Sequence, residues 1–320
     1  MIDILEEIQK QNKVENQDNV DINFNFQQVK EVKTGTVSGL SNNLKDNVKV
    51  ILFCVNNQSF KRTDKTYNQI ICGKSMKDWV LSAVEGYNTK LVDMDSQDDY
   101  FYLTKQNLDL QFKYTLVLFT DTPLLTSKTV TDITEYFAIK NLSVLKFSRG
   151  YMFETDYLSR IEKIYNPQIQ YFEEEDFITA YNLKQFALIT DIMRNRILSY
   201  HQKQGVLIID ANSTQIDADV SIENDVTIYA NNKILGKTII EAGTVLSYNN
   251  IVENSVVMQN SFIENSTIKN SIVGKDCNIQ NYCVLQNKTI LGDQTVLKGY
   301  NILDNKKTAR ATILNPSESR

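Results

Sequence analysis

Histidine is almost absent from this chain of 320 residues, which contains only His201. A single histidine excludes a metal site built on two imidazoles, and any Ser-His-Asp arrangement would depend on that one position. The four cysteines, Cys54, Cys72, Cys277 and Cys283, are far apart or six apart, without CxxC spacing. This spacing argues against a zinc site and against structural disulfides. Any chemistry must therefore use carboxylates, amides, the backbone and a metal ion bound from solution.

The chain also lacks an excess of positive charge and long apolar runs. Its 34 basic and 39 acidic side chains give a net charge of −5, which argues against attraction to a nucleic-acid backbone. No window reaches the ~18 apolar residues of a membrane span, and the amphipathic start MIDILEEIQKQNK has no apolar core of the signal-peptide type. We therefore expect a cytoplasmic protein that binds neither nucleic acid nor membrane.

What the sequence does contain is an aliphatic residue at every sixth position of its C-terminal third. The series runs unbroken from Ile216 to Leu246 and, after shifts of one residue, continues to Leu297. This hexapeptide pattern predicts a short left-handed parallel β-helix, in which three short strands close each triangular coil. At about 18 residues per coil, residues 214–300 correspond to roughly five coils. Small or β-branched residues, expected to point inward, stand four positions after many of the aliphatic ones: Val220, Val226, Thr238, Thr244, Cys277, Cys283, Thr289 and Thr295.

The residues before the β-helix alternate between expected strands and helices. Apolar strands are expected at 48–54 and 114–119, and helices at 76–84 and 129–140, which predicts an α/β domain with parallel strands. The predicted organisation is an extension at 1–46 that is partly ordered, the α/β domain at 47–181, a linker helix at 182–204, the β-helix at 205–300 and a tail at 301–320.

Candidate ligand-binding residues lie where these strands end, because open parallel sheets bind ligands at the carboxyl ends of their strands. After the second strand, Asp121 is placed to hold Mg²⁺ against a phosphate; alternatively, it starts the turn and caps the next helix. The loop after the first strand contains no glycine before Gly73 and is therefore a poor phosphate cradle. Its cations Lys61, Arg62 and Lys65 either attract an anion or form a solvated basic loop.

The order of these parts resembles a known family of bacterial enzymes. An α/β domain, a helix with IMRNRI at 192–197, the segment GVLIID at 205–210 and the hexapeptide coils follow one another. This order is similar to that of the bifunctional N-acetylglucosamine-1-phosphate uridylyltransferase and glucosamine-1-phosphate acetyltransferase. The similarity is most specific over 180–275, and it implies a Rossmann-like nucleotidyltransferase-type domain before the β-helix.

The phosphate-binding residues of that family are replaced in this chain. The family has a glycine-rich loop with an arginine and a catalytic lysine, which ends in Gly-Lys-Pro-Met. Aligned on Gly73-Lys74-Ser75-Met76, its phosphate-handling positions carry Val55 and Asn57 for the glycines, Ser59 for the arginine and Thr66 for the lysine. Lys65 lies one place from the catalytic lysine.

Other family motifs are kept only in part. Asp121 matches the metal-binding aspartate of Gly-Asp-x-Pro-Leu, and Asn182 stands near the second metal ligand. Ser148-Arg149-Gly150 replaces the sugar-binding Asn-Thr-Gly, and the uracil-reading Leu-Gly-Thr-Gly has no counterpart. The resemblance thus implies Asp121 and Asn182 as metal ligands, suggests three substrate contacts and assigns no catalytic residue. The substrate contacts are Lys65, Lys74 and Gly150.

These departures predict a degenerate relative that is non-catalytic or binds a ligand weakly and acts as a scaffold or regulatory subunit. One alternative is a Mg²⁺-dependent uridylyltransferase that makes UDP-N-acetylglucosamine from UTP and the sugar phosphate, with Asp121 on the metal, Asn182 assisting and Lys65 or Lys74 near the triphosphate. Another is a trimeric module that docks a protein partner. In each case we expect a homotrimer. Acetyltransferase activity is not expected, because the family uses a longer β-helix with a catalytic histidine, whereas His201 lies in the linker.

Overall fold

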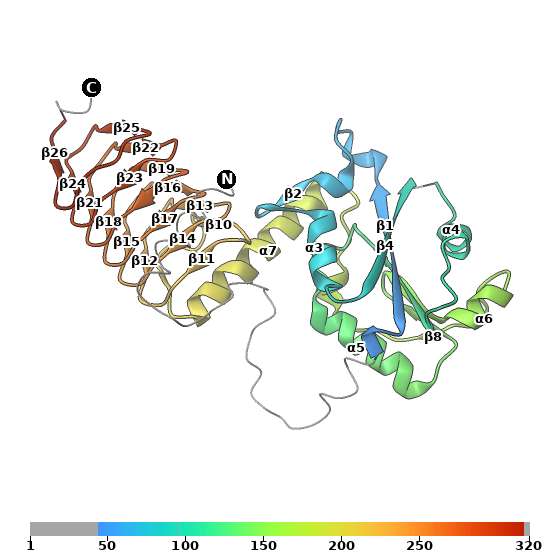
Figure 1. Cartoon of the computed structure of the whole chain (residues 1–320). Coiled ribbons are helices and arrows are strands. Elements are labelled where there is room, and N and C mark those ends of the chain that lie inside the picture. The colour runs from blue at the N-terminus through green and yellow to red at the C-terminus, as the bar shows by residue number, and fades with distance from the viewer. Residues whose placement is uncertain (1–43, 96, 317–320) are drawn as a thin grey trace. The chain divides into compact units, whose positions relative to one another are not determined.

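The computed structural model describes residues 44–316 with the exception of residue 96 (Figure 1). The chain divides into two compact units whose boundary falls between Met193 and Arg194. The predicted extension at 1–46 lies outside the described residues up to residue 43, and β1 begins at Val48.

A six-stranded sheet in the order β4-β1-β5-β7-β6-β8 is the centre of the first unit. Its strands are β4 Asn88–Asp95, β1 Val48–Asn56, β5 Tyr114–Phe119, β7 Gly150–Glu154, β6 Val144–Phe147 and β8 Gln168–Ile169. β1 is parallel to β4 and β5, whereas β7 is antiparallel to β5 and β6. The expectation of parallel strands is therefore wrong at β7. Only Ser148 and Arg149 connect β6 to β7, and two residues can close a hairpin but not a parallel crossover.

Helices cover both faces of this sheet (Figure 1). On β1, Val50 and Leu52 pack with residues of α3 and α5, whereas Ile51 and Phe53 belong to the cluster that includes residues of α4 and α6. All four side chains are fully buried, which explains why β1 is apolar throughout instead of alternating with polar residues. The helices are α3 Met76–Ala83, α5 Ser127–Lys140, α4 Tyr100–Gln106 and α6 Thr155–Arg160.

Short elements complete this unit. The hairpin of β2 Ile70–Ile71 and β3 Lys74–Ser75 precedes α3, and three 3₁₀ helices span Gln58–Phe60, Thr66–Asn68 and Glu174–Phe177. The helix α7 spans Leu183–Lys203, where the sequence predicts a linker helix over 182–204. The boundary between the two units lies inside α7.

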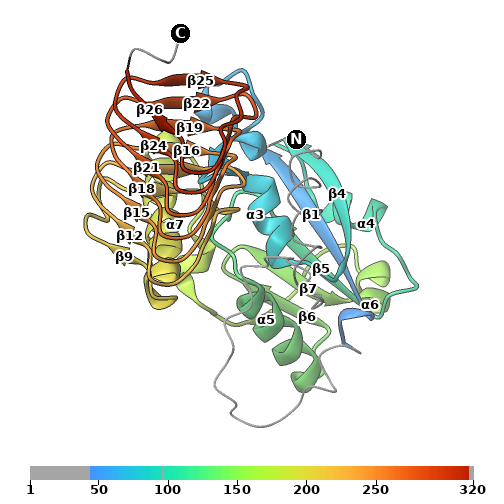
Figure 2. The ribbon, with the colours of Figure 1, turned by 60° about the vertical axis from the view of Figure 1, so that its left-hand side comes forward.

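The second unit is a left-handed parallel β-helix of three sheets (Figure 2). The first sheet contains β10 Gln215–Ile216, β13 Lys233–Leu235, β16 Ile251–Glu253, β19 Thr267–Lys269, β22 Val284–Gln286 and β25 Ile302–Asp304. The second contains β11 Ser221–Ile222, β14 Ile239–Ile240, β17 Val256–Val257, β20 Ile272–Val273 and β23 Ile290–Leu291. The third contains β9 Leu207–Ile208, β12 Thr227–Ile228, β15 Val245–Leu246, β18 Phe262–Ile263, β21 Asn278–Ile279, β24 Val296–Leu297 and β26 Ile313–Leu314.

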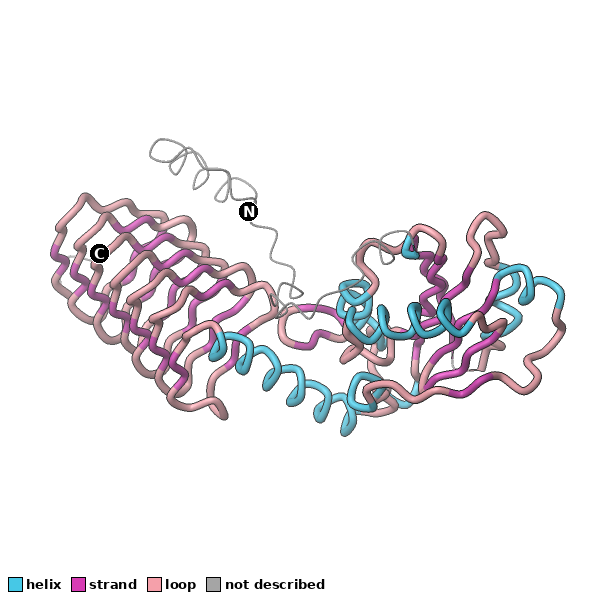
Figure 3. Tube along the Cα trace, turned by 90° about the horizontal axis from the view of Figure 1, so that it is seen from below, coloured by secondary structure: helices cyan, strands magenta, loops and turns pink. Residues whose placement is uncertain are grey.

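The six-residue repeat forms the interior of this β-helix, as the sequence predicts. Ile216 pairs with Ile234 and Ile222 with Ile240 on successive coils, and all four side chains are buried. Figure 3 shows the strands of successive coils stacked in columns. The coils continue beyond residue 300, because β25 and β26 extend the first and third sheets. Residues 302–314, which the sequence assigns to a tail, therefore belong to the β-helix.

The corners explain why this sequence can use asparagine where other chains use glycine. At one corner, successive coils place Asn231, Asn249 and Asn265 at φ of 61°, 60° and 45°. Asparagine enters this left-handed region more readily than most residues, because its short polar side chain bonds locally. The last two coils instead hold Tyr282 and Tyr300 at φ of 64° and 60°, and their rings stack with centroids 5.1 Å apart.

No helix in the described part of the chain is both long enough and apolar enough to cross a membrane.

Candidate functional site

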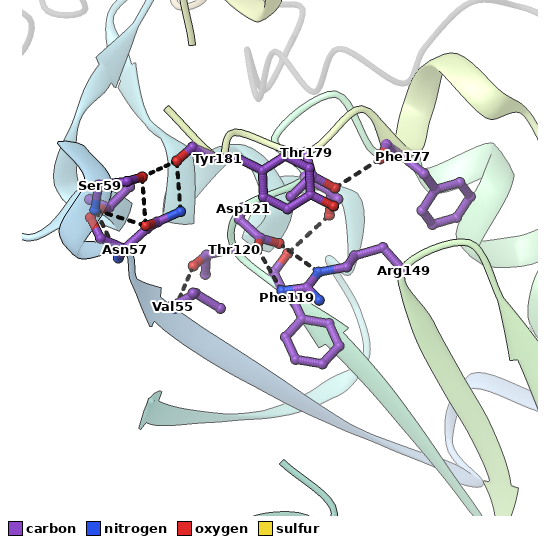
Figure 4. Close-up of polar contacts among 12 residues, drawn as sticks. Val55, Asn57, Ser59, Phe119, Thr120, Asp121, Arg149, Phe177, Thr179 and Tyr181 are labelled. Atoms are coloured by element: carbon purple, nitrogen blue, oxygen red, sulfur yellow. Dashed lines mark hydrogen bonds and ion pairs between the residues drawn. The ribbon is translucent and has the colours of Figure 1, made fainter. Parts of the chain in front are cut away.

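The candidate site lies at the carboxyl end of β5, where the chain turns after Phe119 (Figure 4). Thr120 extends the pairing with β1: its N–H donates to the Phe53 carbonyl at 2.9 Å, and its hydroxyl accepts from the Val55 N–H at 3.0 Å. The next residue, Asp121, is 3% exposed. A buried carboxylate thus stands directly after the end of β5, and its role in binding a ligand stays a prediction.

Arg149 occupies both carboxylate oxygens of Asp121. Its Nε donates to Oδ1 at 3.2 Å and its Nη2 donates to Oδ2 at 2.7 Å, while the guanidinium lies 4.2 Å from the centre of the Phe119 ring. The strand register explains this placement. β7 is antiparallel to β5 with Val117 opposite Tyr151, so two residues further along, Arg149 lies next to Phe119.

Burial and charge act in opposite directions on Asp121. Burial raises the pKa of its carboxyl above the ordinary value, and the adjacent Arg149 guanidinium acts to lower that pKa. The Asp121 backbone carbonyl accepts from the Ala180 N–H at 2.9 Å. Asp121 lies in the turn after β5, as the alternative interpretation has it, but it does not cap the following helix: the cap of α5 is Thr126, whose hydroxyl accepts from the Thr129 N–H.

Asn182, the second predicted metal ligand, caps a helix. Its side-chain oxygen accepts from the N–H groups of Lys184 and Gln185 at 3.0 and 3.1 Å, at the start of α7. The structure therefore gives the two predicted metal ligands different partners within the protein. In this arrangement the two residues do not fit a shared Mg²⁺ ion, because the Arg149 guanidinium already neutralises the Asp121 carboxylate and the Asn182 oxygen faces the N-terminus of α7. Among the described residues, no group of three or more His, Cys, Asp or Glu side chains could hold a metal ion.

The loop after β1 is closed by its own side chains. The Thr66 hydroxyl accepts from the Asn57 N–H at 3.0 Å and donates to the Asn57 carbonyl at 3.1 Å. The Asn57 side-chain oxygen accepts from the Ser59 N–H at 3.0 Å, and the N–H of Thr66 donates to the Asn56 side chain at 3.3 Å. The backbone donors at three aligned phosphate-handling positions, Asn57, Ser59 and Thr66, are thus already used.

The same loop is also tied to the segment before α7. The Asn57 amide nitrogen donates to the Tyr181 carbonyl at 2.8 Å, and the Ser59 hydroxyl donates to the same oxygen (Figure 4). That segment is in turn anchored by Asp176, which is buried and accepts from the hydroxyls of Thr126 and Thr129 at the start of α5. Loop and segment therefore form one hydrogen-bonded unit.

The predicted substrate contacts lie outside this network. Lys65 donates to Asp93 at 3.2 Å, its side chain is 52% exposed, and hydrogen bonds with Tyr67 and Asp93 raise its pKa to about 12. Tyr67 also donates to Asp93, at 3.0 Å. Lys74 lies over the Trp79 ring, 5.4 Å from its centre. Lys65 is thus an exposed cation already paired with a carboxylate.

Gly150 has a structural reason to be glycine. A Cβ atom there would lie 2.4 Å from the Phe147 ring and 2.6 Å from the Val117 carbonyl oxygen, too close for any side chain. Its neighbour Arg149 is a site residue that the sequence pattern does not predict. The available signal is its place in Ser148-Arg149-Gly150, where the resembled family has Asn-Thr-Gly.

Comparison with known proteins finds similarity over the β-helix. Residues 204–315 match the family described as GMPPB C-terminal domain. The bifunctional protein GlmU of Clostridium tetani is 50% identical over 56 residues, which cover 18% of this chain and 12% of the relative. The corresponding Clostridioides difficile protein is 52% identical over 50 residues, or 16% of this chain and 11% of the relative.

These matches confirm the resemblance to the bifunctional family over the C-terminal part of the chain. The matched segments span about an eighth of the length of these relatives. Among solved structures, molybdopterin-guanine dinucleotide biosynthesis protein A from Archaeoglobus fulgidus aligns with 46% of this chain and 99% of its own, at 14% identity and a TM-score of 0.37.

Proposed function

We propose that this chain is a non-catalytic relative of the sugar-phosphate nucleotidyltransferases that acts as a cytoplasmic scaffold or regulatory subunit. The observation that carries the proposal is the closed loop after β1, in which Asn57 and Thr66 bind each other through backbone and side chain. In a phosphate cradle, consecutive N–H groups converge on the anion. Here the corresponding N–H groups point at protein oxygens.

The chemistry of nucleotidyl transfer makes this loss severe. Phosphoryl-group transfer is catalysed mainly by positioning and by donors aimed at the developing charge. Each missing donor of this kind typically lowers the rate by about 10² to 10³, so the loss of several brings turnover to the background of an assay. None of the aligned residues Asn57, Ser59 and Thr66 supplies a cation.

The experiment measures turnover and binding separately. Pyrophosphate release from UTP with N-acetylglucosamine 1-phosphate and Mg²⁺ tests turnover, with an active uridylyltransferase as positive control. Calorimetric titration with UTP and Mg²⁺ tests binding. We expect no turnover above background and at most weak heat of binding. Turnover that disappears in Asp121→Asn would refute the proposal.

Turnover that depends on Asp121 is the result expected from the alternative function, a Mg²⁺-dependent uridylyltransferase. One observation favours it: Asp121 is buried at the carboxyl end of β5, where the resembled family places its metal aspartate. Asp121 and Asn182 would bind the metal, and Lys65 or Lys74 would neutralise the triphosphate. This function requires Arg149 to leave Asp121 and Asn182 to leave the helix cap.

For the β-helix we propose assembly into a homotrimer that presents the α/β domains to a protein partner. Support comes from the stacked coils themselves, which bury aliphatic side chains inside but leave others outside, including Leu207 and Ile313 at 56% exposure each. Apolar side chains on flat sheet faces are covered when sister chains pack against them, and a heterologous contact of this kind can close into a ring.

A further inference from the structure

We propose that the Arg149 guanidinium is a built-in substitute for a divalent cation at Asp121. The inference deepens the proposed function and rests on it: the site keeps the carboxylate of a metal site but neutralises it with a side chain of the same domain. A consequence follows that can be measured without any enzyme activity. Removing the guanidinium should create a divalent-cation site at Asp121, and leaving it in place should prevent one.

The contacts show why the two cations exclude each other. Both Asp121 oxygens accept from Arg149, at 3.2 and 2.7 Å, in the bidentate arrangement that is strongest between guanidinium and carboxylate. A divalent ion of the Mg²⁺ type is bound through one or two carboxylates together with water or phosphate oxygens, each in direct contact with the ion. It can reach the oxygens of Asp121 only if the guanidinium moves away.

Arg149 is held in place independently of its partner. It lies in the two-residue hairpin between β6 and β7, and the register of β7 against β5 places it beside Phe119. The Phe119 ring, 4.2 Å from the guanidinium carbon, stabilises the cation through its negative face. Gly150 fixes the same hairpin against Val117, because no side chain fits there. The guanidinium is therefore a positioned group of the fold.

The burial of Asp121 determines what happens when the guanidinium is removed. The Asp121 side chain is 5% exposed, and a carboxylate that is buried without a counterion is strongly destabilised. Without Arg149 the buried carboxylate loses the counterion that occupies both of its oxygens. The side chain of Arg149 is itself 31% exposed, so its removal opens a route for an ion from solvent. At neutral pH and with a divalent ion present, we expect the ion to bind.

The test uses Mn²⁺ as the probe, because its binding can be followed by electron paramagnetic resonance. The full chain is compared with Arg149→Met, which removes the charge and keeps the length of the side chain, and with Arg149→Lys, which keeps a cation. Arg149→Gln serves as a second neutral variant if Arg149→Met does not fold, as judged by circular dichroism. We expect a Mn²⁺ affinity at least tenfold higher in the neutral variant than in the native chain or in Arg149→Lys.

Two further measurements test whether Mn²⁺ binds at Asp121 and not elsewhere on the chain. The double variant Asp121→Asn with Arg149→Met must lose the Mn²⁺ signal, and Mn²⁺ must raise the melting temperature of the neutral single variant only. The inference is overturned if the native chain binds Mn²⁺ through Asp121, or if a folded neutral variant binds none. Neither result concerns pyrophosphate release, so the failure of this inference and the failure of the proposed function are recorded in separate experiments.

Discussion

The buried titratable side chains Asp121 and His201 differ in what surrounds them. Asp121 is paired with Arg149, whereas neither ring nitrogen of His201 has a hydrogen-bond partner within the described part of the chain. The His201 side chain is 2% exposed, and burial lowers its pKa from 6.5 to about 4. The ring of Tyr200 lies edge-on to it, at 5.3 Å between centroids. Within residues 44–316 as described, His201 thus fills space as a neutral group.

This environment predicts how stability depends on pH. A base whose pKa is lowered on folding takes up a proton more readily in the unfolded chain, so stability falls as pH decreases from 6.5 toward 4. The slope for one such group approaches about 1.4 kcal/mol per pH unit. The variant His201→Met cannot be protonated and should lose this contribution. Urea unfolding followed by circular dichroism at pH 7 and pH 5 measures the difference.

The comparison between the two chains isolates His201, because every carboxyl group is common to both. Removing two unpartnered nitrogens from a buried position should also leave the variant at least as stable at pH 7. An equal change in the urea midpoint between pH 7 and pH 5 in both chains would show that His201 is protonated in the folded protein.

Cys277 provides a second prediction at this scale. It is 1% exposed and occupies the same inward position of the repeat as Thr295 on another coil. Burial raises the pKa of its thiol to about 11, so the group stays neutral. Cys277→Leu should lower the free energy of unfolding by roughly 1–3 kcal/mol, because it overpacks a narrow coil. Cys277→Thr, which copies the other coil, should have a smaller effect. A melting temperature unchanged in Cys277→Leu would contradict the close packing.

At the scale of elements, sequence periodicity predicts the strands whose residues are regularly buried. It misses strands at the edge of the sheet, where few residues are buried. The strand at 114–119 coincides with β5, because all six of its residues are buried and the sequence is uniformly apolar. β4, Asn88–Asp95, is an edge strand whose only buried residue is Met94, so it shows neither an apolar run nor alternation. The β6–β7 hairpin has the turn Ser148-Arg149, which is not one of the usual hairpin signals.

In the candidate site too, the sequence predicts the residue that follows a buried strand but not the partner that strand pairing brings to it. Asp121 can be found because it is the first carboxylate after a buried strand. Its partnership with Arg149 depends on the register between β5 and β7, 28 residues further along the chain, and no local pattern encodes that pairing. The helix-capping role of Asn182 is local and could have been found from its position directly before α7.

Asn182 supplies the prediction at the scale of elements. Asn182→Ala removes the acceptor for the N–H groups of Lys184 and Gln185 and should destabilise the start of α7 by about 1 kcal/mol. Asn182→Asp keeps the cap and adds a favourable charge at the helix N-terminus, so it should be neutral or stabilising. Thermal unfolding measures both variants. Equal stability of all three chains would show that the cap contributes nothing.

At the scale of the whole molecule, the exposed apolar side chains on the outside of the β-helix bear on how the chains assemble. The seven-stranded sheet exposes an apolar side chain on several of its strands: Leu207 on β9, Phe262 on β18 and Ile313 on β26, at 56%, 37% and 56% exposure. These residues lie on one face of a flat sheet, because each is the outward-pointing first residue of its strand. Three copies could cover three such faces through a closed ring.

The assembly can be tested by mass and by a charge placed on this face. Light scattering after gel filtration should give about 110 kDa, three times the 36.8 kDa of one chain. Phe262→Glu places a carboxylate in the centre of the seven-stranded sheet and should shift the mass to that of one chain, because burying an unpaired charge at an interface is unfavourable. Ile302→Glu is the matched control, since Ile302 is 58% exposed but lies on β25, in the six-stranded sheet of the β-helix. A native mass of 36.8 kDa at micromolar concentration would refute the trimer, and dissociation by Ile302→Glu alone would move the interface to the other sheet.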